Sequence, residues 1–396
     1  MELITTTQAL AAACQELASH PFATVDTEFL RDTTFWPKLC LIQMASPEGR
    51  LSLVDPLAEG IDLTPVFELM RNEAVLKVFH AARQDIEIFY NLSGSVPHPV
   101  FDTQVAAAVC GFGESVSYDQ LVRKVKKVEI DKSHRFTDWS RRPLTDKQLR
   151  YAAADVTHLI EPYQHLAGML EKNGRAQWIA EEMEILTSPD TYRLAPEDAW
   201  KRLKMRARKP RELEALKRLA EWREREAQTR DVPRGRIIKD DVIYEVCTQL
   251  PDTTAALGHI RALPRGFERS KQGESILEIV KSVKEMGDSD LPRMPRPERR
   301  PQAHPAVTDL LKVLLKQVSE DEGVASRMIA TAEEVEMIAG DDNADVPALS
   351  GWRREIYGEL ALRLKHGEIA LAVDGSKLVR VEREQPAEKR KTAVSR

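Results

Sequence analysis

The sequence predicts an N-terminal α/β domain with a mixed sheet, followed by all-helical domains. Three strand-like stretches joined by short connections come first, and segments in which helix and strand alternate come next. From about residue 189 the chain becomes charged and helical, without strand alternation. At 396 residues the chain is also too long for one ordinary core, so we expect two or three domains.

The first half begins with an amphipathic helix over Gln8–Leu17, capped by Thr7. Three strands of an antiparallel meander follow, since the connections between them are short. Their ranges are Thr24–Phe29, Lys38–Met44 and Leu51–Val54. The alternating part comprises a helix at Leu63–Arg71, a strand at Val75–Phe79, a helix at Asp85–Leu92 and a long helix that begins near Thr145.

Composition limits the compartment and the partners of the chain. The 42% hydrophobic content is enough for packed cores, and the formal net charge of −5 gives no bulk attraction for nucleic acid. The scattered cysteines, without a C-x-x-C pair, argue against a structural zinc and against a disulfide framework. Glu2 stands where a signal peptide carries positive charge, and no segment approaches the roughly 20 apolar residues that span a bilayer. We therefore expect a soluble, cytoplasmic protein with no membrane partner.

Two carboxylates lie two positions apart on the first strand of the predicted meander. A pleat of period 2 directs Asp26 and Glu28 to the same face of the sheet. Neighbouring carboxylates repel each other and raise each other's pKa unless a cation lies between them. Taken alone, the pair is better explained by polar residues on a half-exposed edge strand. Further acids later in the sequence favour a metal site instead.

Three later positions complete the candidate site. Asp85 lies at the opening of a helix just after a buried strand, where the helix dipole also favours an acid as a cap. Tyr151 and Asp155 share one face of the long helix, and the three alanines between them let that face approach the sheet closely. Asp102 also lies at the end of a strand, and we assign it a structural or supporting role.

The complete set has the chemistry of a metal-dependent phosphodiesterase. Oxygen-rich acids suit hard cations such as Mg²⁺ or Mn²⁺, which fill their remaining positions with water and substrate phosphate. Two such ions about 3.5–4 Å apart stabilise both the attacking and the leaving oxygen of an in-line displacement. This set therefore indicates phosphoryl hydrolysis. Its members are Asp26, Glu28, Asp85, Tyr151 and Asp155.

Three short motifs occur in order along the first half. They are Val-Asp-Thr-Glu-Phe at 25–29, Phe-His-Ala-Ala-Arg-Gln-Asp at 79–85 and Tyr-Ala-Ala-Ala-Asp at 151–155. Together with Thr-Asp-Trp at 137–139 and Arg-Pro-Leu-Thr at 142–145, they make the chain resemble the ribonuclease D family of DEDDy 3′-to-5′ exonucleases. The resemblance covers essentially the whole chain. It implies a ribonuclease H-like α/β exonuclease domain with a mixed sheet, which we assign to residues 1–190.

The resemblance also implies a role for each site residue. Two Mg²⁺ or Mn²⁺ ions are bound by the four acids Asp26, Glu28, Asp85 and Asp155, with Asp26 touching both ions. Tyr151 orients the attacking water and helps to activate it, although an ordinary pKa of about 10 argues against a simple free base near neutral pH. Phe29 and His80 are candidates for stacking on the terminal nucleotide or hydrogen bonding to it. A core phenylalanine and a satisfied buried imidazole are the alternatives for these two positions.

The substrate implied by the family is RNA with a free 3′ hydroxyl end. Attack on the last phosphodiester releases nucleoside 5′-monophosphates, and tRNA precursors and other structured RNAs are the expected substrates of a monomeric enzyme. One alternative is a nucleic-acid-binding scaffold whose nuclease fold is inactive. The complete set of acids argues against this alternative. The other is an exonuclease acting on DNA, because related exonucleases use the same acids and the contacts that read a 2′ hydroxyl are not evident in the sequence.

The second half resembles the helical HRDC domains of this family. We assign a first HRDC domain to residues 205–288 and a second, divergent HRDC-like domain to residues 303–376. A weak internal repeat supports the pair, because Arg236–Asp240 is similar to Arg327–Thr331, with a capping Asp or Thr at the matching place. The remaining ranges are a stiff Pro/Arg-rich linker at 289–302 and a charged tail at 377–396.

A basic run and an apolar stripe open the second half. Arg202–Arg211 is dense in positive charge, and either it is a solvated face or backbone phosphates are its partner. Leu213, Leu216, Leu219 and Trp222 recur at helical spacing and predict a buried helix face with Trp222 inside the core. We expect the helical domains to grip and orient nucleic acid rather than to perform chemistry.

Overall fold

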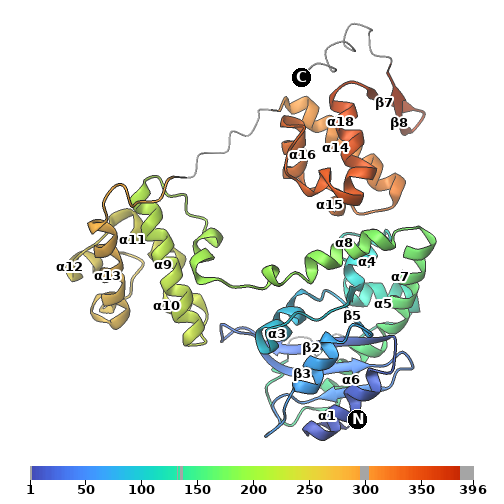
Figure 1. Ribbon diagram of the computed structural model, residues 1–396, viewed down its shortest axis with the longest axis horizontal. Helices are drawn as coiled ribbons and strands as arrows, with labels where there is room; N and C mark the ends of the chain where they lie inside the picture. The colour runs from blue at the N-terminus through green and yellow to red at the C-terminus, as the bar shows by residue number, and fades with distance from the viewer. Residues whose placement is uncertain (1, 132, 134–136, 295–302, 384–396) are drawn as a thin grey trace.

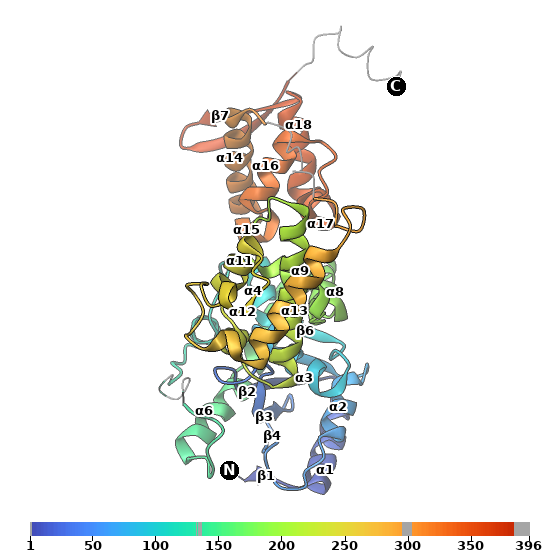
Figure 2. The ribbon, with the colours of Figure 1, turned by 90° about the vertical axis from the view of Figure 1, so that its left-hand side faces the viewer.

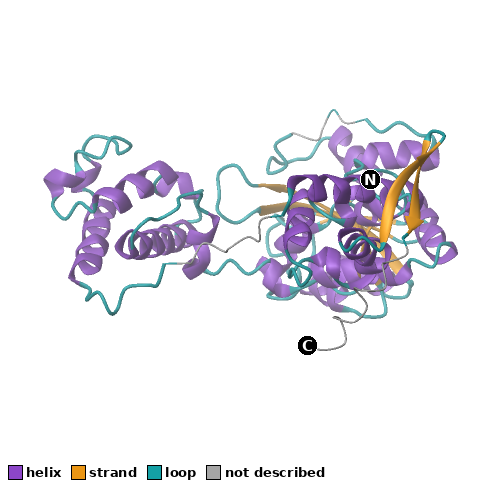
Figure 3. Ribbon diagram, turned by 90° about the horizontal axis from the view of Figure 1, so that it is seen from above, coloured by secondary structure: helices purple, strands orange, loops and turns teal. Residues whose placement is uncertain are grey.

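The computed structural model describes residues 2–383 except 132, 134–136 and 295–302, and it contains three packed units (Figure 1). The first is an α/β unit with a six-stranded mixed sheet, and the other two are largely helical. Figure 3 shows that the strands belong to the first unit and to one hairpin of the last, whereas the middle unit consists of helices and loops. The predicted order of an α/β domain and then helical domains is confirmed. Parts of the predicted linker (295–302) and tail (384–396) lie outside the described residues.

The sheet has the strand order β1-β4-β3-β2-β5-β6. Its strands are β1 (Leu3–Ile4), β2 (Phe22–Leu30), β3 (Lys38–Ala45), β4 (Leu51–Val54), β5 (Leu76–Phe79) and β6 (Val100–Asp102). The pairs β2–β3 and β3–β4 are antiparallel, as the predicted meander requires, and β5 and β6 add parallel to β2. Parallel neighbours need a crossover connection, which explains the alternation of helix and strand after the meander. Because β5 pairs only with Phe22–Thr24, the second half of β2 extends past the end of β5.

Helices cover both faces of this sheet. In the described part of the first unit they are α1 (Thr7–Leu17), α2 (Thr64–Arg71), α3 (Arg83–Ser93), α4 (Thr103–Val109), α5 (Tyr118–Lys126), α6 (Asp146–Thr157), α7 (Ile160–Lys172) and α8 (Ala176–Leu186). The larger core joins one sheet face to most of these helices. A smaller core packs Leu149 and Ala152 of α6 against Leu41 and Leu53 on the other face. No described helix is both long and apolar enough to cross a membrane.

The cap of α1 lies one residue earlier than predicted. Thr6 is the N-cap, because its backbone is extended and its hydroxyl accepts a hydrogen bond from the Ala9 N–H at 3.3 Å. Thr7 is instead the first helical residue. Two threonines in succession leave the sequence ambiguous, and only the backbone conformation decides which of them caps the helix.

An ion pair between Arg142 and a buried carboxylate fixes the loop that precedes α6. The Arg142 guanidinium donates to both carboxylate oxygens of Asp55, at 2.7 and 2.6 Å, and also to the Cys40 carbonyl at 2.7 Å. Burial opposes ionisation of Asp55, but the hydrogen bonds from Arg142 and from the Leu57 N–H, together with the Arg142 charge, outweigh it and keep the pKa of that carboxyl below its usual value. The pair joins the loop to β3 and to the end of β4. It therefore sets where Thr145 starts α6, with a capping box to Gln148.

The first helical unit is built on one long helix. Two 3₁₀ turns, η1 (Pro189–Thr191) and η2 (Pro196–Arg202), lead into α9 (Pro210–Thr229), α10 (Arg234–Ile237), α11 (Asp240–Gln249), α12 (Thr254–Leu257), the 3₁₀ turn η3 (Phe267–Arg269) and α13 (Lys271–Glu285). Leu216 and Leu219 of α9 pack in the core of this unit with Val246 and Val280. Trp222 is only half-buried, because it lies between this core and a loop of the first unit. The prediction that Trp222 is a core residue is therefore only partly right.

The second helical unit ends in a hairpin whose second strand the sequence analysis assigned to the tail. Its elements are α14 (Pro305–Glu322), α15 (Ser326–Ile329), α16 (Ala332–Gly340), the 3₁₀ turn η4 (Pro347–Leu349), α17 (Gly351–Arg353), the π-helical turn η5 (Arg354–Gly358), α18 (Glu359–Lys365), β7 (Ile369–Asp374) and β8 (Lys377–Glu382). The assignment of a tail from residue 377 is wrong, because β8 pairs antiparallel with β7. Gly375, with φ +60°, allows the tight turn between the two strands.

The two helical units share a pattern of a short helix followed by a longer one. The matching positions in the two units are one residue further apart in the chain than in the predicted sequence repeat. In each unit a four-residue helix, α10 or α15, leads into a longer helix, α11 or α16. Thr331 caps α16, whereas the matching cap of α11 is Lys239, whose side chain makes no capping bond. Asp240 is therefore not a cap. Its carboxylate instead accepts a hydrogen bond from Arg223 at 2.6 Å.

The second helical unit rests on α4 and α8 of the first unit, as Figures 1 and 2 both show. The ring of Trp352 stacks on that of Trp178 at 4.6 Å between centroids. Arg353 pairs with Glu182 at 2.7 Å, and both side chains are largely buried. The contact combines apolar stacking with a shielded ion pair, in which loss of one charge would leave the other buried without its partner.

Candidate active site

Strand β2 supplies the first two acids and also the contact that places the third. Asp26 and Glu28 project from the same face of β2, as predicted. The Thr24 hydroxyl, two positions earlier, donates to the carbonyl of Val156 at 3.0 Å. Because Val156 follows Asp155 on α6, this bond holds the end of α6 against β2. The buried Ala152 leaves room for that close approach, as the alanine run predicted.

Three of the predicted acids form one cluster. The carboxylates of Asp26, Glu28 and Asp155 each offer an oxygen within 4.8 Å of the other two. All three side chains are half-buried. Burial, followed by the charge of Asp155, raises the pKa of Asp26 well above its ordinary value. A cation would relieve this repulsion, so the donor set fits a hard divalent metal ion.

The fourth acid lies beside the cluster rather than within it. Asp85 is buried in the first turn of α3, where its carboxylate accepts a hydrogen bond from the Thr27 hydroxyl. Burial and the nearby charge of Asp26 raise the pKa of Asp85. The structure thus places Asp85 within electrostatic reach of Asp26 but outside the three-acid group.

Tyr151 lies next to the cluster on α6. Its phenol hydrogen-bonds the Asp155 side chain. Burial is the main reason that the pKa of Tyr151 is raised, and the charges of Asp155, Glu28 and Asp26 add to the effect. The phenol therefore keeps its proton at neutral pH.

The cluster opens into a cavity of about 460 Å³. The two predicted nucleotide-contacting residues, Phe29 and His80, both line it. The Nδ1 atom of His80 lies 3.0 Å from the Thr103 hydroxyl, and the imidazole also interacts with the Val116 backbone. Burial lowers the pKa of His80, so the imidazole is neutral at pH 7.

The sequence analysis missed Tyr118 as a component of the cavity wall. Its hydroxyl donates to the Ala154 carbonyl at 2.7 Å, and its ring lies 5.6 Å from that of His80. Burial, with the charges of Asp155 and Asp26, raises the pKa of Tyr118. A capping box from Ser117 begins α5 at Tyr118. That local signal marks the start of a helix, but it does not show that the helix starts at the cavity.

Asp102 has the supporting role that the sequence analysis assigned to it. Its carboxylate accepts three backbone N–H groups, from Ala81 at 2.9 Å, Ala82 at 2.8 Å and Gln104 at 2.8 Å. Ala81 has φ +61°, a left-handed conformation that is unfavourable for alanine. Asp102 thus stabilises the turn that leads from β5 into α3, and through it the position of Asp85.

Comparisons with known proteins match both halves of the chain. The model of the 3′-5′ exonuclease family matches residues 1–171, and that of the HRDC domain matches residues 212–280. Ribonuclease D of Nitrobacter hamburgensis is 54% identical over 97% of this chain and 100% of that protein. Ribonuclease D of Acidiphilium cryptum is 48% identical over 95% and 96%. The crystal structure of Escherichia coli RNase D, titled an exoribonuclease involved in structured RNA processing, matches with a TM-score of 0.80 at 30% identity, covering 92% of this chain and 98% of that one.

Proposed function

The chain belongs to the ribonuclease D family and is a 3′-to-5′ exoribonuclease, and from this premise we propose how its residues divide the reaction among them. The observation that carries the proposal is the cluster of Asp26, Glu28 and Asp155, whose carboxylate oxygens lie within 4.8 Å of one another. Three acids held this close are destabilised by repulsion unless cations neutralise them. The cluster is therefore the place where divalent ions and a phosphodiester would meet.

We assign two divalent cations, Mg²⁺ or Mn²⁺, to the four acids. Glu28, Asp155 and Asp26 would hold one ion, and Asp26 with Asp85 would hold the other. Asp26 would be the shared ligand, because its carboxylate lies within 4.8 Å of that of Asp155 and its charge also acts on Asp85. When bound, the ions stabilise negative charge on the attacking and leaving oxygens.

Tyr151 orients the attacking water and does not act as a free base. Its O–H bonds Asp155, so the phenolic oxygen is left to accept a hydrogen bond from water. The raised pKa keeps the phenol protonated at neutral pH. Tyr151 therefore contributes position and orientation to the reaction.

The cavity residues position the last nucleotide of the RNA. We assign Phe29 to stacking on the terminal base and the His80 imidazole to a hydrogen bond with the nucleotide, because both side chains line the cavity. A substrate held in this way ends in a free 3′ hydroxyl, and its hydrolysis releases a nucleoside 5′-monophosphate. tRNA precursors and other structured RNAs with single-stranded 3′ ends are the substrates that we propose.

The domains follow the ranges assigned from the sequence, with one change. We propose an exonuclease domain at 1–190, an HRDC domain at 205–288 and a divergent HRDC-like domain that starts at 303 and includes the β7–β8 hairpin. The short-helix pattern shared by α10–α11 and α15–α16 supports the second HRDC-like assignment. We also propose a monomer in the cytoplasm, where the four free cysteines would stay reduced.

The test is a product time course on a tRNA with a short 3′ extension, with Mg²⁺ or Mn²⁺ and with a chelator. Stepwise shortening with release of 5′-monophosphates, abolished by the chelator, is expected. Degradation of a matched DNA strand alone would favour the DNA exonuclease instead. Binding of the RNA without cleavage of either polymer would favour the silent scaffold.

The variant that tests the metal site directly is Asp26→Asn. The substitution removes the shared charge and changes the side-chain volume very little, so the far-UV circular dichroism should match that of the wild type. Turnover should be lost. Normal turnover by the folded variant would rule out the proposed metal site.

A further inference from the structure

We propose that a second, arginine-lined cavity, between the exonuclease domain and the first helical unit, binds the backbone of the single-stranded RNA that precedes the cleaved phosphodiester. The inference rests on the proposed function, because it concerns the same substrate. It identifies a binding site for the part of the RNA that the metal cluster does not contact. The residues of the cavity come from both domains.

The two domains meet at the loop between β2 and β3. The carboxylate of Asp231, which follows α9, accepts hydrogen bonds from the backbone N–H groups of Phe35 and Trp36, at 3.0 and 2.9 Å. The Arg234 guanidinium lies 4.5 Å from the centre of the Phe35 ring, and Phe35 is buried. The loop is thus held to the helical unit by hydrogen bonds, a cation–π contact and apolar packing. This contact gives the cavity one wall from each domain.

The cavity has a volume of about 570 Å³ and a positive lining. Its four arginines are Arg31, Arg83, Arg202 and Arg234. Two carboxylates offset them in part. Glu87 pairs with Arg31 at 2.6 Å, and the buried Glu224 bonds both Arg202 and Arg234 at 2.6 Å. A net positive charge remains, which suits a polyanion.

Arg83 is the arginine best able to contact a phosphate. Its side chain is exposed in the first turn of α3, and it makes no ion pair within the residues that the structure describes. It also lies at the positive end of the α3 helix dipole. A phosphate would therefore replace only water around Arg83 and would break no bond within the protein.

The arginine-lined cavity lies next to the active-site cavity. Gln84 lines both of them. Arg83 precedes Asp85 by two residues on α3. Arg31 directly follows β2 and lies three residues after Glu28, a distance of roughly 10 Å in extended backbone. A strand whose 3′ end lies at the metal cluster would reach this cavity within the next few nucleotides.

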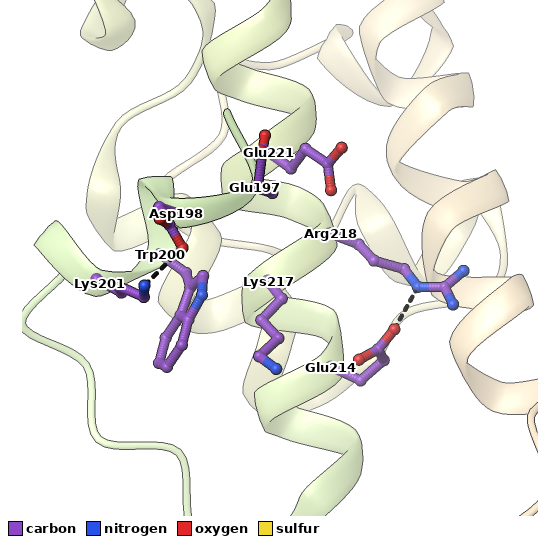
Figure 4. Close-up of a pocket in the computed structure, with 8 residues that line it drawn as sticks. All are labelled: Glu197, Asp198, Trp200, Lys201, Glu214, Lys217, Arg218 and Glu221. Atoms are coloured by element: carbon purple, nitrogen blue, oxygen red, sulfur yellow. Dashed lines mark hydrogen bonds and ion pairs between the residues drawn. The ribbon is translucent and has the colours of Figure 1, made fainter. Parts of the chain in front are cut away.

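The first helical unit also has a groove that, unlike the arginine-lined cavity, is not positively charged. Figure 4 shows the groove between η2 and α9, of about 620 Å³, in which four carboxylates face three cationic side chains. Lys201 pairs with Asp198 at 2.7 Å and Arg218 with Glu214 at 2.6 Å. Such a groove repels a phosphate backbone rather than attracting it.

The run Arg202–Arg211 is likewise not uniformly available to RNA. The Arg211 guanidinium donates to the carbonyls of Val283, Lys284 and Met286 and pairs with Asp288. It satisfies free carbonyls at the end of α13 and so has a structural role. Of the basic run, Arg202 lines the cavity between the domains.

The test measures binding of a single-stranded RNA of ten nucleotides as a function of salt, with every variant in the inactive Asp26→Asn background. Arg83→Gln and Arg31→Gln should each weaken binding at low salt by about tenfold. Each should also lower the slope of log affinity against log salt by about 0.7, the contribution of one phosphate contact on a single strand. The double variant should show both effects together.

The matched control is Arg225→Gln. Arg225 is exposed on α9, pairs with Glu221 and does not line the cavity. The salt slope of this variant should equal that of the parent protein. If the slopes for Arg83→Gln and Arg31→Gln also equal that of the parent, the proposed RNA path is wrong.

A second measurement separates this inference from the proposed function. In the active enzyme, the ratio of kcat/KM for the ten-nucleotide RNA to that for a dinucleotide should fall about tenfold on Arg83→Gln, because the dinucleotide is too short to span both cavities. An unchanged ratio would overturn the RNA path. If the unmodified protein cleaves neither RNA, it is the proposed function that fails.

Discussion

The turn that carries Asp85 should depend on Asp102, and Asp102→Asn tests this dependence. The wild-type carboxylate accepts N–H groups from Ala81 and Gln104 on one oxygen and from Ala82 on the other. An asparagine keeps one oxygen and presents an NH₂ group to the remaining N–H. The Ala82 N–H, which is buried, then loses its acceptor.

The expected cost follows from these three bonds. A hydrogen bond to a charged group contributes about 1.5–3 kcal/mol, and loss of the charge weakens the two bonds that remain. We expect Asp102→Asn to lower the free energy of unfolding by about 2–4 kcal/mol, a large part of the roughly 5–15 kcal/mol of an ordinary domain. Because Ala81 no longer has its left-handed turn stabilised, Asp85 should shift, and kcat should fall about tenfold even where the protein is folded.

Urea unfolding and steady-state kinetics on RNA check both parts of this prediction. Asp62→Asn is the matched control, since Asp62 is an exposed aspartate whose carboxylate accepts hydrogen bonds from the Thr64 N–H and hydroxyl, within its own turn. That control should change stability by less than about 0.5 kcal/mol. If Asp102→Asn behaves like the control in both stability and kcat, Asp102 does not hold the turn.

Three further predictions concern the cluster and the second helical unit. Tyr151→Phe should lower kcat by about 10²-fold with little change in KM, because it removes the group that orients water; an unchanged kcat would contradict that role. Burial raises the folded-state pKa of Asp26 and Asp85, so the folded protein binds more protons there than the unfolded chain. The metal-free protein should therefore lose stability as pH rises above about 4, and Mg²⁺ should reverse the loss. The measurement is the difference in Tm between wild type and Asp26→Asn across pH 5–8. A difference that does not change with pH would refute the prediction. Arg353→Met leaves Glu182 buried without its cation and should lower the free energy of unfolding of the second helical unit by about 3 kcal/mol. This unit should then unfold in a separate, earlier transition. A single unchanged transition would show that the ion pair is dispensable.

The sequence was sufficient for the parts of the fold that depend on local patterns. Alternation in the meander placed β2 to β4, and the Thr145 capping box with its alanine run placed α6 and its close approach to the sheet. The same periodicities put Asp26 and Glu28 on one face and Tyr151 and Asp155 on another. These features repeat within a few residues, so they can be read from one segment at a time.

The features that were missed depend on contacts between distant segments. Tyr118 reaches the cavity because α5 packs against α7 and the Tyr118 hydroxyl bonds the Ala154 carbonyl of α6. Asp85 lies beside the three-acid group, where the Thr27 hydroxyl binds its carboxylate. Asp240 has the chemistry of a cap, but Arg223, 17 residues earlier, takes its carboxylate. The β8 strand was missed because the turn at Gly375 lies next to a charged segment that has the composition of a tail.

Strand β2 links the metal cluster to the proposed RNA path. Its middle carries Asp26 and Glu28, and Arg31 follows directly after its last residue. The loop beyond Arg31 is fixed to the first helical unit through Asp231. A displacement of β2 would therefore move the metal acids and the arginine-lined cavity together. The helical unit can thus control where the RNA backbone runs relative to the metal acids without contributing a residue to the chemistry.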